Sequence, residues 1–252
     1  MTDAVGVFAG LWHADTLILF LIAALTGLVR GFAGFGAAMV FVPLASILVL
    51  PQTAVITLWL MDFAIALPMT VRSFRSCNWT EIRPLFAGAV LGVPVGVWML
   101  ANLPPEPMKW IISVAVLAAV AGLASGWRRS RPLATPGVAA IGTVSGIGSG
   151  LSGLSGPPVI VFWASGQGTG AEMRTNIFAF FGLTGMMAGL MHFTFGLFTP
   201  ERLALAAMLA PGYALAFWSG TRIFGFASEK TFRTFALSLC AVAALMVMPV
   251  WG

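Results

Sequence analysis

Charged residues are scarce in this sequence: Asp, Glu, Lys and Arg make up 8% of its 252 residues, whereas soluble domains average about 25%. Hydrophobic residues make up 59%. Such a chain has too few charged side chains to cover a folded surface in water. The composition therefore excludes an ordinary soluble protein and predicts an all-α polytopic membrane protein.

Cysteine is almost absent, with Cys77 in an expected loop and Cys240 in the last apolar run. Two scattered cysteines exclude a disulfide framework and offer no metal site, and no cofactor is expected. The first 15 residues contain two Asp but no Lys or Arg, so they lack the basic segment of a signal peptide. The first apolar run is therefore expected to remain in the mature protein.

Apolar runs of the roughly 17–25 residues that a spanning helix needs recur along the chain. They cover about 53–71, 85–101, 108–127, 175–198, 203–221 and 234–251. Shorter apolar pieces flank two glycine-rich breaks, at about 16–29, 35–50, 137–147 and 154–164. These short pieces predict helices that cross only part of the membrane.

The two glycine-rich breaks are copies of one pattern. Gly27, Gly31 and Gly34 coincide with Gly146, Gly150 and Gly153 when the sequence is shifted by 119 positions. In secondary transporters, glycine-interrupted apolar segments at corresponding positions of two halves indicate the substrate site. The repeat therefore predicts a carrier with a site built from both breaks.

The net charge of +5 comes from Lys and Arg next to the apolar runs. This placement is typical of cytoplasmic anchoring and argues against a nucleic-acid partner. Basic residues place the segments 72–83, 128–131 and 222–233 in the cytoplasm, and the charge-poor segments 102–109 and 196–202 outside.

The loop after the run 53–71 is thus inside, whereas its counterpart after 175–198 is outside. This reversal predicts two inverted repeats, each a glycine-broken helical hairpin followed by three transmembrane helices. The expected boundaries are 1–127 for the first repeat, 128–136 for a cytoplasmic linker and 137–252 for the second repeat. Together they form one transmembrane domain.

The segment 30–36, Arg-Gly-Phe-Ala-Gly-Phe-Gly, is followed by Val42-Pro43-Leu44 and echoed at 152–159 by Ser-Gly-Leu-Ser-Gly-Pro-Pro-Val. This doubled motif resembles the TauE/SafE, or sulfite exporter, family of membrane permeases over nearly the whole chain. The resemblance implies a multi-pass protein of the bacterial inner (plasma) membrane. It also implies a small anionic substrate, such as sulfite, an organosulfonate or an organic acid.

A helix that restarts inside the membrane presents free amide groups and a partial positive charge, both of which suit an anion. Restarts are expected near 35–38 and 154–158, where glycine lets the backbone approach the ligand closely. Serine hydroxyls of the second copy add hydrogen-bond donors. The predicted substrate-binding residues are Arg30, Gly31, Gly34, Phe35, Gly36, Ser149, Gly150, Ser152, Gly153, Ser155, Gly156, Arg174 and Asn176.

Arg30 and Asp62 are charged residues within apolar surroundings, where charge usually marks function. Arg30 is expected to bind the anion, or alternatively to cap the carbonyl groups at the end of the first broken helix. Asp62 either carries a coupling proton or neutralises Arg30. A sodium ion is the other candidate coupling ion.

Two further side chains lie near the ends of the long helix expected over 175–198. Arg174 either recruits anions at the cytoplasmic mouth or anchors its helix at the membrane surface. His192 lies near the outer end of its helix, where an interfacial histidine with satisfied hydrogen bonds is expected.

Two alternative functions can be inferred from the same residues. The tetrad Gly150-Leu-Ser152-Gly153, with His192 downstream, matches the Gly-x-Ser-Gly pattern of intramembrane serine proteases. Because the repeat alone explains these glycines, we expect a transporter and no enzymatic activity. A passive anion channel is the main alternative, since it also needs positive potential inside the membrane.

Overall fold

The computed structural model describes residues 14–125, 133–164, 166, 168–223 and 229–249. Every regular element in these ranges is an α-helix. The expected all-helical class is therefore confirmed for the described part of the chain.

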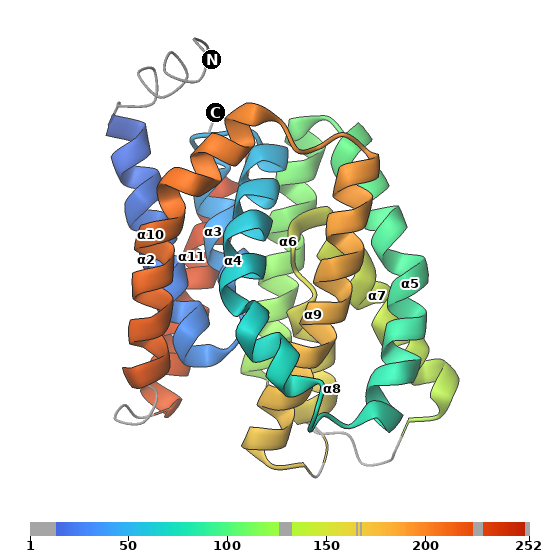
Figure 1. The fold of residues 1–252 in the computed structure, drawn as a ribbon. Coiled ribbons are helices and arrows are strands. Elements are labelled where there is room, and N and C mark those ends of the chain that lie inside the picture. Colours follow the sequence, from blue (N-terminus) through green and yellow to red (C-terminus); the bar gives the residue numbers. More distant parts are fainter. Residues whose placement is uncertain (1–13, 126–132, 165, 167, 224–228, 250–252) are drawn as a thin grey trace.

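Within the described residues, the helices fall into two sets of five, in which two helices separated by a short break precede three longer ones (Figure 1). The first set is α2 (Ala14–Ala33), α3 (Ala37–Ala45), α4 (Pro51–Ser73), α5 (Trp79–Asn102) and α6 (Pro105–Ala124). The second set is α7 (Thr135–Ser152), α8 (Gly156–Ala164), α9 (Gly170–Thr194), α10 (Pro200–Ile223) and α11 (Glu229–Val247).

Local capping chemistry explains where several long helices begin. The side chain of Asn78 accepts a hydrogen bond from the Thr80 amide at the start of α5. Thr169 and Glu172 form a reciprocal capping box at the start of α9. Such caps satisfy amide groups that have no partner inside the helix.

Six helices within the described residues are long and apolar enough to cross a membrane. They are Asp15–Ala33, Pro51–Ser73, Trp79–Asn102, Pro105–Ala124, Gly170–Thr194 and Pro200–Arg222. The expected spanning run 234–251 is not among the six, and its described apolar helix is the shorter Leu237–Val247. Two expected short pieces are longer than predicted: α7, expected over about 137–147, covers Thr135–Ser152, and α2, expected over about 16–29, continues to Ala33. The helix continues through Arg30 because that charge is paired in the interior, as described below.

Both breaks occur slightly after their predicted centres, at 34–36 and 153–155. Gly34, Gly36 and Gly153 have φ angles of 76°, 91° and 72°. These left-handed conformations favour glycine, which has no Cβ atom. In the second break, the amides of Gly153 and Leu154 donate to the Ser149 and Gly148 carbonyls, and the Gly153 bond is that of the αL motif that ends many helices.

The other repeated glycines pack helices together. A Cβ atom on Gly31 would lie 2.0 Å from the Phe217 carbonyl oxygen of α10, and one on Gly150 would lie 2.4 Å from the Val93 carbonyl oxygen of α5. The broken helix of each set therefore packs closely against the fourth helix of the other set. Gly88, Gly92, Gly96 and Gly220 make equally close approaches, as expected for glycines spaced four apart.

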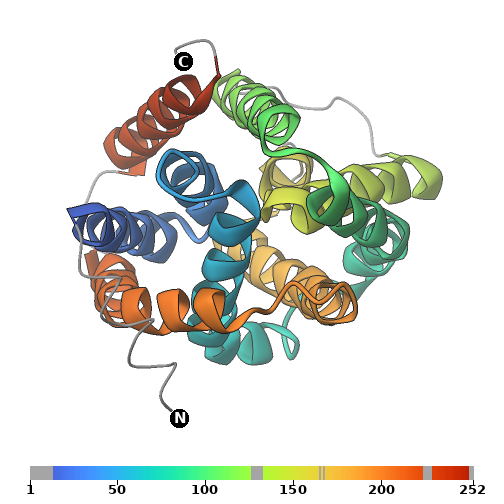
Figure 2. The same ribbon diagram turned by 90° about the horizontal axis from the view of Figure 1, so that it is seen from above.

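Corresponding helices of the two sets run in opposite directions. In Figure 1, α4 runs from the upper to the lower end of the bundle, whereas α9 runs upward; α5 and α10 are opposed in the same way. Figure 2 shows α3 near the centre of the bundle, surrounded by longer helices.

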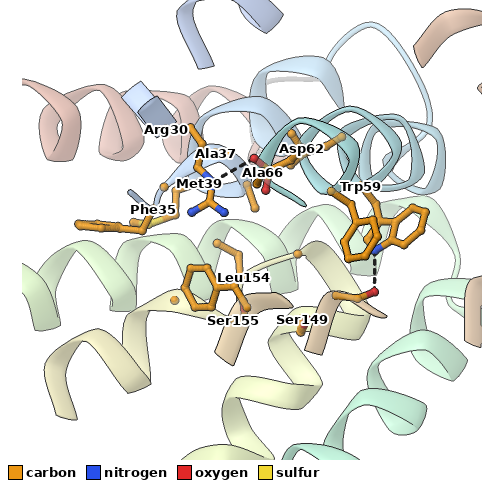
Figure 3. Close-up of a pocket in the computed structure, with 18 of the residues that line it drawn as sticks. Arg30, Phe35, Ala37, Met39, Trp59, Asp62, Ala66, Ser149, Leu154 and Ser155 are labelled. Carbon is orange, nitrogen blue, oxygen red and sulfur yellow. Dashed lines mark hydrogen bonds and ion pairs between the residues drawn. The ribbon is translucent and has the colours of Figure 1, made fainter. Parts of the chain in front are cut away.

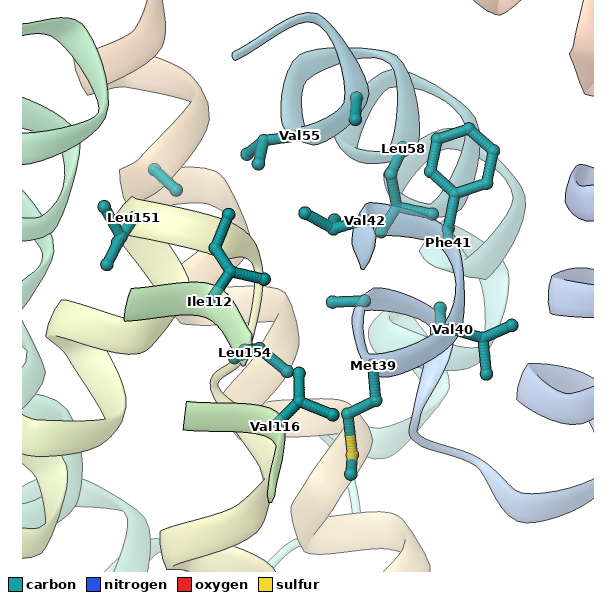
Figure 4. Close-up of a cluster of buried hydrophobic side chains, with 14 of the residues drawn as sticks. Met39, Val40, Phe41, Val42, Val55, Leu58, Ile112, Val116, Leu151 and Leu154 are labelled. Atoms are coloured by element: carbon teal, nitrogen blue, oxygen red, sulfur yellow. The ribbon is translucent and has the colours of Figure 1, made fainter. Parts of the chain in front are cut away.

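The nine-residue helix α3 is buried on nearly all sides. Its apolar side chains Met39, Val40, Phe41 and Val42 pack with residues of α4 and α6 (Figure 4), and α3 also contacts α2 and α11. A short helix gains its stability from such packing, since an isolated helix of this length is unstable. The core therefore holds the N-terminus of α3 at a fixed place beside the first break.

We predict that Gly31→Ala destabilises the protein because the new methyl group meets the α10 backbone. Overpacking of this kind costs about 1–3 kcal/mol, which exceeds the roughly 0.5–1 kcal/mol gained by replacing glycine in a helix. Thermal unfolding in detergent measures the loss. Gly170→Ala is the matched control, because no atom lies within 4 Å of its added Cβ. Equal melting temperatures for the two variants would contradict the packing role.

Candidate functional site

A cavity of about 90 Å³ lies between the two breaks. One buried water needs about 10–15 Å³ on this measure, so the cavity has room for several water-sized groups. Residues of α2, α3, α4, α7, α8 and α9 line it, together with residues of both breaks. In Figure 3, Arg30 and Asp62 approach from α2 and α4, and Leu154 and Ser155 face them from the second break.

Arg30 is the central charged group of this site. Its side chain is 4% exposed, and its Nε atom donates to Oδ1 of Asp62 at 3.0 Å. Another guanidinium nitrogen, Nη1, donates to the Gly34 carbonyl at the end of α2. The two sequence interpretations, capping of the broken helix and pairing with Asp62, are therefore both present in one side chain.

Tyr213 completes the polar cluster from α10. Its hydroxyl donates to the same Oδ1 atom of Asp62 at 2.5 Å. The carboxylate thus has two donors, and the cluster joins α2, α4 and α10. Hydrogen bonds to charged groups are about twice as strong as those between neutral groups.

Aromatic rings surround the arginine. The guanidinium carbon of Arg30 lies 5.4 Å from the ring centre of Phe178 and 5.5 Å from that of Phe181. Arg174 approaches Phe178 at 5.9 Å and donates through Nη2 to the Gly31 carbonyl at 3.3 Å. All three distances from guanidinium to ring suit cation–π contact. Arg174 therefore contacts the end of α2 and does not line the cavity.

Two helix N-termini border the cavity. The helix α3 begins after Gly36 without a side-chain cap, and Ala37, Ala38 and Met39 of its first turn line the cavity. Gly156 and Pro157, which begin α8, also line it. Both restarts fall within the predicted windows. Helix N-termini carry a partial positive charge and unpaired amides, so this wall is suited to a negatively charged ligand.

The cavity brings together part of the predicted residue set. Arg30, Phe35, Gly36, Asp62, Ser149, Gly153, Ser155 and Gly156 line it. Gly31, Gly34, Gly150, Ser152, Arg174 and Asn176 do not.

Other contacts explain two of the residues outside the cavity. The Ser152 hydroxyl donates to the Gly148 carbonyl of its own helix at 3.2 Å. The Asn176 side chain accepts a hydrogen bond from the Asn78 amide at 2.8 Å and thereby joins α9 to the start of α5.

Trp59 and His192 are among the cavity residues that the sequence reasoning did not name as binding residues. Trp59 donates from Nε1 to the Gly185 carbonyl at 2.9 Å, and its ring lies against Gly189. His192 is 1% exposed and lines the cavity, yet neither ring nitrogen has a hydrogen-bond partner. The prediction of an interfacial histidine with satisfied hydrogen bonds is therefore wrong. Glycines at 182, 185 and 189 mark the α9 face that contacts α4, and this spacing was a usable signal.

Comparison with known families identifies the chain. The model of the sulfite exporter TauE/SafE family matches residues 19–247. The chain belongs to this family. Comparisons with curated proteins and with solved structures gave no match. TauE/SafE membership indicates a multi-pass membrane transporter of sulfur anions and no enzymatic activity.

The site geometry agrees with the absence of protease chemistry in a TauE/SafE protein. A serine nucleophile needs a base within hydrogen-bond reach. Ser152 instead donates to Gly148, and His192 makes no hydrogen bond. These two residues therefore form no catalytic pair.

We predict that Asp62→Asn strongly destabilises the protein, because Arg30 then keeps its buried charge without a counter-charge. Removing one partner of a buried ion pair costs about 3–5 kcal/mol. The double variant Arg30→Gln/Asp62→Asn should lose less than the sum of the two single variants, since no lone charge remains. Thermal unfolding of the purified proteins tests this. A fully stable Asp62→Asn protein would contradict the structural role of the pair.

Proposed function

We propose that this protein is a secondary transporter that binds sulfite, or a similarly small organosulfonate or organic acid, in the cavity between the two breaks. The observation that carries the proposal is the meeting of two helix N-termini and Arg30 at one cavity. The guanidinium of Arg30 and the first-turn amides of α3 supply N–H donors, and Gly156 supplies one at the start of α8, where Pro157 and Pro158 have none. Together they suit an oxyanion with several acceptor oxygens.

Charge balance supports a small anion as the ligand. Asp62 offsets the charge of Arg30, so the positive potential of the cavity comes mainly from the helix termini. A guanidinium has five N–H donors, and the contacts to Asp62 and Gly34 use two of them. Arg30 can therefore remain paired while it contacts a ligand.

The arrangement of the two helix sets supports alternating access. We propose an inverted repeat with halves 1–127 and 137–252 joined by a cytoplasmic linker at 128–136. The reversed helix directions and the exchanged pairs α2–α10 and α5–α7 support it. In such folds, movement of one half against the other exposes a central site to each side in turn. We place the protein in the bacterial inner membrane.

Labelling of single cysteines tests the inversion. In a Cys240→Ser background, we expect Cys77, after α4, to face the cytoplasm, and Phe195→Cys, after α9, to face the outside. An impermeant maleimide reports the side of each. Burial raises the pKa of the Cys77 thiol, and because the thiolate is the nucleophile, its labelling should accelerate with rising pH. Labelling of both positions from one side would exclude the inverted arrangement.

Sulfite flux in proteoliposomes tests the binding site. Arg30→Gln/Asp62→Asn should abolish flux because it removes the guanidinium without leaving a lone charge. Ser149→Ala removes a hydroxyl that lines the cavity and should weaken affinity by about 0.5–1.5 kcal/mol, the value of a neutral hydrogen bond.

Ser152→Ala is the matched control for the serine variant, because this hydroxyl donates to its own helix. Equal losses for the two serine variants would place the site elsewhere. Accelerated exchange with sulfite on the opposite side indicates a carrier. Its absence, together with flux that does not saturate, would indicate a passive channel.

A further inference from the structure

His192 is a buried polar side chain that the proposed anion site leaves unexplained. It lies in the last turn of α9, and its ring borders the cavity. The rings of Trp59 and Phe198 meet it edge-on, at centroid distances of 5.9 Å and 6.2 Å. The imidazole is therefore held in place by aromatic packing.

Neither ring nitrogen of His192 makes a hydrogen bond, although the Gly150 carbonyl lies near the ring. A neutral imidazole has one donor and one acceptor, and buried polar groups in proteins are normally paired. The ring therefore brings two unmet polar positions to the cavity. Such a side chain suits a ligand or a proton that is not always present.

The charged groups around His192 are already engaged. On α4, Asp62 is paired with Arg30. At the start of α10, Arg202 donates to the Leu197 carbonyl and to Thr53, and its neighbour Glu201 is exposed. No carboxylate within the described ranges lies within ion-pair distance of His192.

The remaining packed helices add no counter-charge. Residues 135–152 of α7 include no titratable side chain. The charged residues of α5, Glu81 and Arg83, lie in its first turns, beside the opposite end of α9, where Asn176 contacts Asn78. A positive charge on His192 would thus be buried without a partner, which is costly.

An anion in the cavity removes this cost. We propose that His192 takes up a proton when the anion binds, so that the transporter carries one proton with each anion. The proton moves from water on the open side to a ring nitrogen and returns to water on the other side when the anion leaves. The C-terminal end of α7, to which Gly150 belongs, also favours a cation at this position.

This inference rests on the proposed function but assigns coupling to a different residue from the one expected. Asp62 already accepts hydrogen bonds from Arg30 and Tyr213. His192 has neither a donor nor a counter-ion in place. The imidazole is therefore the group whose proton can respond to the ligand.

Nuclear magnetic resonance of ¹⁵N-labelled histidine tests the proposal directly. The chain has only one other histidine, His13, so His13→Gln leaves a single imidazole. Near neutral pH we expect the ¹⁵N shifts of a neutral ring without ligand and those of an imidazolium with saturating sulfite. An imidazole that stays neutral with sulfite bound would overturn the proposal, as would one already charged without it.

Flux measurements supply the second test. With the outside one pH unit more acidic, one-to-one coupling raises the limiting accumulation of anion by about tenfold. Sulfite itself binds a proton near neutral pH, so variants are compared under the same gradient. We expect the pH gradient to raise anion accumulation more in wild type and His13→Gln than in His192→Gln. An equal response of all three proteins would overturn the proposal.

The proposed transport function and the proposed proton coupling can be overturned separately. Absence of sulfite flux in wild type without a pH gradient would overturn the proposed function and the coupling with it. Normal flux with an unchanged imidazole signal would overturn the coupling alone. Because the resonance experiment uses the native residue at 192, it decides the question even if His192→Gln does not fold.

Discussion

The ion pair between Arg30 and Asp62 is the interaction on which the first break depends. A charge in the interior of a membrane protein needs a partner, and Asp62 supplies it from α4 while Tyr213 holds the carboxylate from α10. The same guanidinium caps the Gly34 carbonyl, so the end of α2 is tied to the two helices that flank it. Because α3 begins only three residues later, this cluster also sets where the N-terminus of α3 meets the cavity.

A neutralised arginine suits a carrier better than a free one. A carrier must pass through its cycle with the site both occupied and empty, and an unpaired cation would be costly in the empty state. Asp62 removes that cost while helix N-termini retain a positive potential that cannot be titrated away. An anion can then bind through amides and remaining guanidinium donors without first breaking the pair.

The fold class and the two breaks were predictable because they depend on local signals: apolar runs, and glycines repeated 119 positions apart. The role of each glycine could not be predicted from the sequence, because glycine serves two different purposes in this fold. Gly34 and Gly153 adopt left-handed conformations, whereas Gly31 and Gly150 let helices approach, and only the tertiary contacts distinguish these roles. The same holds for His192, whose missing hydrogen bonds depend on helices distant in the sequence.

The two copies of the sequence repeat differ in charge at equivalent positions. The positions equivalent to Arg30 and Asp62 in the second copy are Ser149 and Phe181, and the Phe181 ring lies against the Arg30 guanidinium. The second break thus lacks a fixed cation of its own. The helix α9 brings a basic side chain to each broken helix, since Arg174 donates to Gly31 at the end of α2 and His192 lies near Gly150 at the end of α7. One end therefore has a permanent charge, and under the coupling that we propose the other gains a charge when His192 takes up a proton.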